Sequence, residues 1–139
     1  DAVDSFMPVA IQKNVSIISK FNDDLVINCD TGEMEIIFNN LLSNAIKYNK
    51  ENGEVNFELA NNGNRLIIVV QDTGIGMSDE EKSNLFKEFM RAKNIKTKDI
   101  AGSGLGLSIM KKVVDLNKGT VDVETEPDKG TKFTIEIPL

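Results

Sequence analysis

The stretch from Glu33 to Tyr48, EMEIIFNNLLSNAIKY, constrains the fold of this chain more than any other. Its apolar residues recur at the spacing of one face of an α-helix, namely Met34, Ile37, Phe38, Leu41, Leu42 and Ala45. Asp30 precedes the stretch and Glu33 follows three residues later, a spacing that predicts a capping box. We therefore expect an amphipathic helix that ends near Lys50 and buries its apolar side.

Three polar side chains, Asn40, Asn44 and Lys47, form a second stripe on this helix because they recur at i, i+4 and i+7. Two amide oxygens and one ammonium on one face suit a magnesium–phosphate cluster. Mg²⁺ prefers oxygen ligands and is usually held by few protein groups together with phosphates and waters. The alternative is an ordinary solvated face, which is the default on an amphipathic helix.

Short helices and strands follow one another along the whole chain. The patterns predict helices over 4–14, 78–89 and 108–117, and strands over 15–21, 25–29, 54–60, 65–72, 120–126 and 131–137. Ser78 and Glu81 predict a second capping box, at the start of the helix over 78–89. This order indicates an α+β fold, a two-layer sandwich with helices packed on one face of a mixed sheet. In the last helix we expect Ile109, Val113, Val114 and Leu116 to be buried, with Gly119 as its C-terminal stop.

Composition excludes several classes of function. The net charge of −6 argues against nucleic-acid binding through a basic surface. No run of about 18 apolar residues could span a membrane. The single cysteine, Cys29, excludes an internal disulfide, fits a reducing compartment and is expected in the core. The chain contains no histidine, so it holds no histidine-based triad, metal ligand or phosphoacceptor. Its length fits one domain over 1–139, and its opening DAVD is expected to lie inside a longer protein.

Asp72 ends the predicted strand over 65–72 and is followed by Gly74 and Gly76. A carboxylate at this position can accept a hydrogen bond from an exocyclic amine such as that of adenine. The two glycines would let a flat ligand approach the backbone. The alternative is simply a tight turn between a strand and a helix.

A second glycine-rich segment, with Gly102, Gly104 and Gly106, precedes the last predicted helix. Backbone amides at the start of a helix suit phosphate, although the spacing is neither that of a dinucleotide fold nor that of a P-loop. The segment before it is basic, with Arg91, Lys93, Lys96 and Lys98 against the single acid Asp99, and we expect a mobile loop there; taken alone, it would equally be a solvated surface loop. Together with the amide-bearing helix and Asp72, these segments predict a site for ATP held by magnesium.

The chain resembles the catalytic ATP-binding domain of sensor histidine kinases, within the wider GHKL superfamily. The similar segments are NNLLSNAIKY (39–48, the N box), DTGIGM (72–77, the first glycine box), LFKEFMR (85–91, the F box), GSGLGL (102–107, the second glycine box) and the closing DKGTKFTIEIPL (128–139). The resemblance covers essentially the whole chain. It implies the Bergerat fold, a two-layer α/β sandwich with about five strands packed on three main helices.

The resemblance also implies roles for individual residues. Asn44 would be the principal magnesium ligand, with Asn40 a second ligand or a support, and Lys47 would contact phosphate. Asp72 would read the adenine amine, supported by Thr131 through water. The other nucleotide contacts that it implies are Tyr48, Gly74, Ile75, Gly76, Arg91, Lys93, Gly102, Ser103, Gly104, Leu105, Gly106 and Leu107. Lys96 and Lys98 would share the ATP lid with Arg91 and Lys93, and Phe86 and Phe89 would anchor its base or pack in the core.

Hydrolysing members of the superfamily carry a glutamate general base four residues before the magnesium asparagine. Here that residue is Asn40, so the resemblance implies phosphoryl transfer rather than efficient hydrolysis. The acceptor would be a histidine on a separate dimerisation domain of the same full-length protein, followed by the receiver domain of a response regulator. We expect this domain alone to be a cytoplasmic monomer that does not autophosphorylate or bind nucleic acid, and its parent, membrane-anchored or soluble, to be a homodimer.

Two other functions stay open from the sequence. One is a GHKL serine kinase of the anti-sigma-factor type, and the other is a degenerate nucleotide-binding module that only mediates interactions. The N-box match and the closing EIPL favour the histidine kinase. Asn44, Asp72 and the three glycines of the second glycine box argue against degeneracy.

Overall fold

The computed structural model describes Pro8, Ile11 and residues 15–21, 31–61, 64–83 and 106–138. Several predicted features lie outside these residues: most of the helix over 4–14, the strand over 25–29 with Cys29, the capping residue Asp30, and the segment LFKEFMR. The outcomes below concern the described part of the chain.

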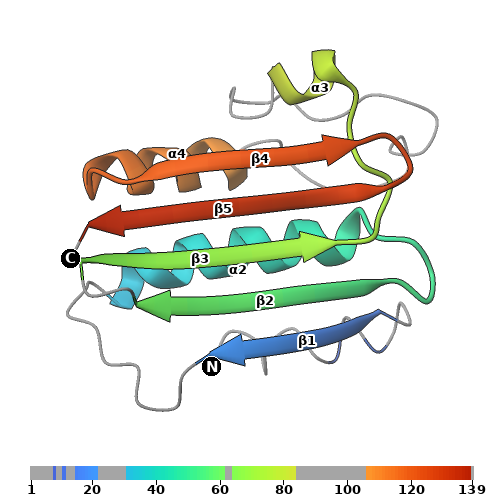
Figure 1. Cartoon of the computed structure of the whole chain (residues 1–139), viewed down its shortest axis with the longest axis horizontal. Helices are drawn as coiled ribbons and strands as arrows, with labels where there is room; N and C mark the ends of the chain where they lie inside the picture. The colour runs from blue at the N-terminus through green and yellow to red at the C-terminus, as the bar shows by residue number, and fades with distance from the viewer. Residues whose placement is uncertain are drawn as a thin grey trace.

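Five strands form one mixed sheet in the order β1–β2–β3–β5–β4 (Figure 1). Their bounds are β1 Ser16–Phe21, β2 Glu54–Asn61, β3 Arg65–Asp72, β4 Thr120–Glu126 and β5 Gly130–Pro138. β1 runs parallel to β2, and the other neighbours are antiparallel. The almost wholly apolar strand β3 is central, as its lack of polar alternation predicts.

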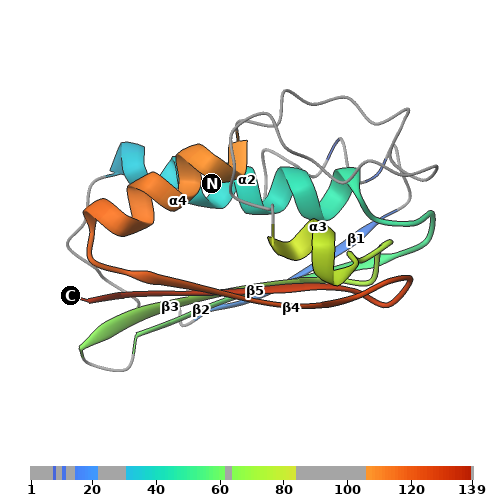
Figure 2. The same cartoon turned by 90° about the horizontal axis from the view of Figure 1, so that it is seen from above.

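Three helices accompany the sheet in the described residues: α2 (Thr31–Lys47), α3 (Asp79–Ser83) and α4 (Gly106–Leu116). Figure 2 shows α2 and α4 on the same side of the sheet, and the two helices contact each other. The expected two-layer α+β sandwich is therefore confirmed. Ser78 and Glu81 form the predicted capping box before α3, because each side-chain oxygen accepts a hydrogen bond from the other residue's backbone amide at 3.2 Å.

The core lies between the helices and the sheet. Ile37, Leu41 and Leu42 of α2 are fully buried, as their helical spacing predicts. They face alternate residues of β3, of which Leu66 and Ile68 are also fully buried. On each strand the period of two places one set of side chains on this core face and the other set on the opposite face.

The buried side of α4 differs from our expectation. Met110, Val113 and Val114 are buried, whereas Ile109 is 44% exposed and Leu116 is 78% exposed. Apolar side chains occur on both sides of this helix, and residues one position apart differ by about 100° in direction. Packing against α2 and the sheet selects the face with Met110, which periodicity alone does not distinguish.

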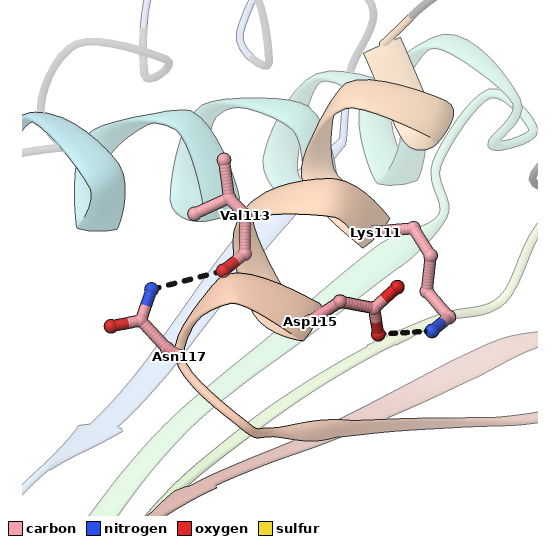
Figure 3. Close-up of polar contacts among 4 residues, drawn as sticks. All are labelled: Lys111, Val113, Asp115 and Asn117. Atoms are coloured by element: carbon pink, nitrogen blue, oxygen red, sulfur yellow. Dashed lines mark hydrogen bonds and ion pairs between the residues drawn. The ribbon is translucent and has the colours of Figure 1, made fainter.

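The C-terminal end of α4 also departs from the simplest expectation. Lys118, not Gly119, has the left-handed backbone (φ +60°). The amide of Gly119 donates to the Val114 carbonyl at 2.9 Å, as in a Schellman motif. Gly119 is needed for space, since a Cβ there would lie 2.6 Å from the Glu136 carbonyl oxygen. The Asn117 side chain folds back to donate to the Val113 carbonyl at 2.9 Å, beside the ion pair of Lys111 and Asp115 (Figure 3).

Candidate functional site

The end of α2 is attached to the segment 72–77 by backbone. α2 ends at Lys47, three residues earlier than expected. The carbonyl of the next residue, Tyr48, accepts a hydrogen bond from the Ile75 amide at 3.0 Å. Gly74 lies so close that a Cβ on it would be 2.2 Å from the Tyr48 oxygen. The predicted magnesium helix and the Asp72 segment thus meet at one edge of the sheet.

Asn49 adds a side-chain attachment at the same place, and it is 5% exposed. Its Oδ1 accepts from the Lys50 amide at 2.9 Å and from the Thr73 hydroxyl at 3.2 Å. Its Nδ2 donates to the Glu54 carbonyl at 3.0 Å. The Thr73 hydroxyl also accepts from the Glu54 amide at 2.9 Å, which closes the network. Because this network uses both ends of the Asn49 amide, it holds the segment firmly to α2.

The other side of the segment 72–77 is attached to the hairpin of β4 and β5. The Asp128 amide donates to the Ile75 carbonyl at 2.7 Å, and the Met77 amide donates to the Thr125 hydroxyl at 3.0 Å. Gly76 has φ +65°, and a Cβ there would lie 1.8 Å from the Glu126 carbonyl oxygen. Both glycines of this segment are therefore required by the protein's own packing, whether or not a ligand binds.

Asp72 is 8% exposed at the end of β3. Its Oδ1 accepts from the amides of Gly74 at 2.9 Å and Thr131 at 3.3 Å. Burial raises the pKa of Asp72 from 3.8 to about 6, and the two amides offset part of this rise. Its Oδ2 has no hydrogen-bond partner among the residues that the structure describes. The carboxylate is thus fixed through one oxygen, and the other can accept from a ligand.

Thr131 contacts Asp72 as expected, but directly. Its backbone amide donates to the Asp72 carboxylate, whereas we expected Thr131 to support Asp72 through water. Its hydroxyl lies 3.0 Å from the hydroxyl of Thr125. Asp72 and Thr131 are brought together by the register of the sheet, because they lie opposite each other in the ladder of β3 and β5.

The predicted magnesium ligands lie on the polar side of α2. The Nδ2 of Asn40 donates to the Ile36 carbonyl at 2.7 Å, so Oδ1 is the atom left for a ligand. Asn44 is half-buried, and within the described ranges its side chain has no hydrogen-bond partner. Lys47 is exposed in the last turn of α2. The helix thus presents two amide oxygens and a cation one turn apart, as the spacing predicts.

The second glycine box lies mostly outside the described residues, which include its last two positions. Gly106 begins α4, and the Leu107 side chain packs against the core. Any contact of Gly106 or Leu107 with a phosphate would therefore come from their backbone amides. The other site residues that the sequence predicts lie outside the described ranges. They are Arg91, Lys93, Lys96, Lys98, Gly102, Ser103, Gly104 and Leu105, together with Phe86 and Phe89.

Sequence reasoning missed Asn49 and Thr125. Asn49 directly follows the N box, but its partner Thr73 is 24 residues away and no periodicity connects them. Thr125 continues the inward alternation of Val121 and Val123, and a polar residue at such a position was the available signal.

The sequence matches the family of histidine kinase-, DNA gyrase B- and HSP90-like ATPases over residues 29–139. The sensor protein CiaH of Streptococcus pneumoniae is 41% identical over 71% of this chain and 22% of its own length. The sensor histidine kinase RppB of Synechocystis is 30% identical over 100% of this chain and 31% of its own length. The chain therefore spans less than a third of each of these relatives.

Solved structures agree. Histidine kinase ThkA, in complex with the response regulator protein TrrA, superposes with a TM-score of 0.79 and 25% identity, over 99% of this chain and 38% of that one. In the described residues, no helix is long and apolar enough to cross a membrane. The chain belongs to the histidine kinase-, DNA gyrase B- and HSP90-like ATPases, and within them to the catalytic ATP-binding domains of sensor histidine kinases.

Proposed function

We propose that this domain binds MgATP and donates the γ-phosphoryl group to a histidine on a separate dimerisation domain of its full-length protein. The observation that carries the proposal is Asp72, a buried carboxylate held through Oδ1 alone. Burying a charge is costly unless it is paired. A carboxylate placed this way, with its second oxygen left without a partner in the described residues, fits a ligand that supplies a hydrogen-bond donor.

The 6-amino group of adenine is such a donor. Above a pH of about 6, the pKa of Asp72, its carboxylate is ionised and only accepts hydrogen bonds. It would therefore bind the adenine amine and reject the 6-carbonyl of guanine, which is itself an acceptor. A site built around one polar group discriminates strongly against a base that leaves that group unpaired.

The donor set on α2 fits magnesium. Mg²⁺ takes oxygen ligands and retains phosphates and waters, so few protein groups suffice. The amide oxygens of Asn44 and Asn40 would hold the ion, and Lys47 would neutralise phosphate charge. The bound ion would supply charge neutralisation on the phosphates. The first amides of α4 from Gly106 onward would add hydrogen bonds to phosphate.

Transfer to an acceptor, rather than hydrolysis, is supported by Asn40. A general base stands at this position in the hydrolysing relatives, and an amide cannot take a proton from water. The chain contains no histidine, so the acceptor would lie elsewhere. A response regulator would then receive the phosphoryl group, as the complex of ThkA with TrrA suggests. The dependence on ATP supports a cytoplasmic location for this domain.

Calorimetric titration of the chain with ATP and with GTP, each with magnesium, tests the nucleotide half of the proposal. We expect ATP to bind and GTP to be excluded. Asp72→Asn should weaken ATP binding with the fold intact, and Asn44→Asp should weaken the productive binding of magnesium–ATP, because it changes the charge and the donors of the ligand. Asn56→Asp, on the opposite face of the sheet, is the matched control for Asn44→Asp. Equal affinity of Asp72→Asn and the parent for ATP would show that Asp72 does not read the base.

Incubation with radiolabelled ATP and the dimerisation domain of the full-length protein tests the transfer half. We expect label on that domain's histidine, as a phosphoryl group that is labile in acid and stable in base. Release of inorganic phosphate without labelling would instead indicate a hydrolase.

A further inference from the structure

Asp72, Thr131 and Thr125 form one row across three strands, which we call the polar row. Asp72 lies opposite Thr131 in the ladder of β3 and β5, and Thr131 lies opposite Thr125 in the ladder of β5 and β4. The preceding row on the same face is Val70, Phe133 and Val123, all buried. The polar row therefore closes the core face of the sheet at the edge where segment 72–77 begins.

The Thr125 hydroxyl makes three contacts, each at 3.0 Å. It meets the Met77 amide, the Gly130 carbonyl oxygen and the Thr131 hydroxyl. A hydroxyl has one proton to donate and two lone pairs that accept. Met77 can only donate and Gly130 can only accept, so all three contacts are hydrogen bonds in a single arrangement. In that arrangement Thr125 donates to Gly130 and accepts from both Met77 and Thr131.

This arrangement commits the only hydroxyl proton of Thr131 to Thr125. The Thr131 hydroxyl can then only accept a hydrogen bond from a ligand that contacts the polar row. Asp72 is its neighbour across the ladder, and an ionised carboxylate also presents lone pairs alone. Asp72 and Thr131, the side chains that would face the 6-position of a purine, therefore form a wall of the site that offers hydrogen-bond acceptors and no donor.

We infer that Thr125 is a specificity-determining residue for the nucleotide, acting through the proton of Thr131. This rests on the proposed function, because it concerns the same adenine site. By holding that proton away from the base, Thr125 keeps the wall complementary to an amino group. Without the Thr125 hydroxyl, Thr131 is released to rotate and donate to a carbonyl at the 6-position, so discrimination against such bases falls.

Inosine triphosphate is the probe, because it replaces the 6-amino group of ATP with a carbonyl and adds no group elsewhere on the ring except the N1 proton. We would measure the dissociation constants of ATP and inosine triphosphate, with magnesium, for the parent chain, Thr125→Val and Thr125→Ser. Valine keeps the branched shape without the hydroxyl, and serine keeps the hydroxyl. Discrimination is the dissociation constant of inosine triphosphate divided by that of ATP. We expect Thr125→Val to lower this ratio by about three- to tenfold, the size of one net hydrogen bond. Thr125→Ser should leave the ratio as in the parent.

A purely structural role for Thr125 would lower both affinities and the melting temperature while leaving the ratio unchanged, and that result would overturn the inference. A changed ratio in Thr125→Ser would overturn it as well. If Thr125→Val does not fold, Thr125→Ala carries the same expectation, since it also removes the hydroxyl.

A double-mutant cycle tests whether the effect passes through Thr131. In a Thr131→Val background, Thr125→Val should leave the ratio unchanged to within about twofold, because the proton that it would release is gone. An undiminished effect in that background would refute the route through Thr131. A parent chain that binds neither nucleotide would refute the proposed function and this inference together. A parent chain that prefers ATP, with a ratio that Thr125→Val does not change, would refute this inference alone.

Discussion

Gly76 lies so close to Glu126 that a Cβ atom on it would be 1.8 Å from the carbonyl oxygen of Glu126. Its backbone is also left-handed, at φ +65°. We predict that Gly76→Ala lowers the free energy of unfolding by about 2–4 kcal/mol, through backbone strain and overlap. Urea unfolding would measure this. The loss of nucleotide binding in such a variant would then report displacement of segment 72–77 and not a lost contact with the base.

Gly32→Ala is the matched control for this variant. Gly32 is exposed in the first turn of α2, where alanine suits the helix better than glycine. This control should be neutral or stabilising. Equal unfolding curves for Gly76→Ala and the parent would show that the hairpin of β4 and β5 leaves room for a side chain at Gly76.

Removal of the Asn49 amide should destabilise the chain. Asn49→Ala removes a buried amide and leaves its part-buried partners, in particular the Glu54 carbonyl and the Thr73 hydroxyl, without this hydrogen bond. We expect a loss of about 1–3 kcal/mol in the free energy of unfolding, the usual cost of such unpaired groups. Asn56→Ala, on a half-buried position of β2, should cost less. Similar losses for the two variants would argue that the Asn49 network is not a specific attachment.

The stability of the ligand-free chain should depend on pH through Asp72. Its pKa is about 6 in the folded chain and 3.8 when unperturbed, so the folded state binds more protons between these values. Stability should therefore fall as pH rises from about 4 to about 6, by about 3 kcal/mol from this group, and stay level above that. Asp72→Asn should remove this part of the slope.

Thermal or urea unfolding at several pH values checks the Asp72 prediction, with Asp122→Asn as the control. Asp122 is an exposed carboxylate on β4, so its removal should leave the slope unchanged. A slope that survives in Asp72→Asn would assign the titration to another group.

Asn117 connects the two main helices. Its Nδ2 donates to the Glu33 carboxylate at 2.7 Å as well as to the Val113 carbonyl, and so joins the end of α4 to the start of α2. A double-mutant cycle with Asn117→Ala and Glu33→Ala should give a coupling of about 1 kcal/mol in the free energy of unfolding. Lys111→Ala should cost little, because its ion pair with Asp115 is exposed. Strict additivity of the two alanine variants would contradict the contact.

Much of the fold could be predicted from local patterns. The apolar spacing of α2, the alternation of β2 and the capping residues Ser78 and Glu81 each agree with the structure. These signals succeed because helices and strands place side chains at fixed periods, and because a capping box is completed within four residues. The candidate ligands on α2 and the carboxylate of Asp72 were also visible, since the types of side chain and their spacing point to oxygen ligands and a hydrogen-bond acceptor.

What the sequence by itself determined is the set of elements, the position of Asp72 at the end of a buried strand and the polar stripe of α2. Only the tertiary structure decided which apolar side of α4 is buried, because Ile109 and Met110 are equally suited to a core until α2 packs against one of them. It also decided the hydrogen-bond partners of segment 72–77. These partners are Asn49, Thr125 and Thr131, which are separated by 24 to 59 positions in the sequence from the residues that they contact. Such contacts leave no period in the sequence. Each depends on the register of the sheet and on where the chain returns, which packing of the whole core fixes.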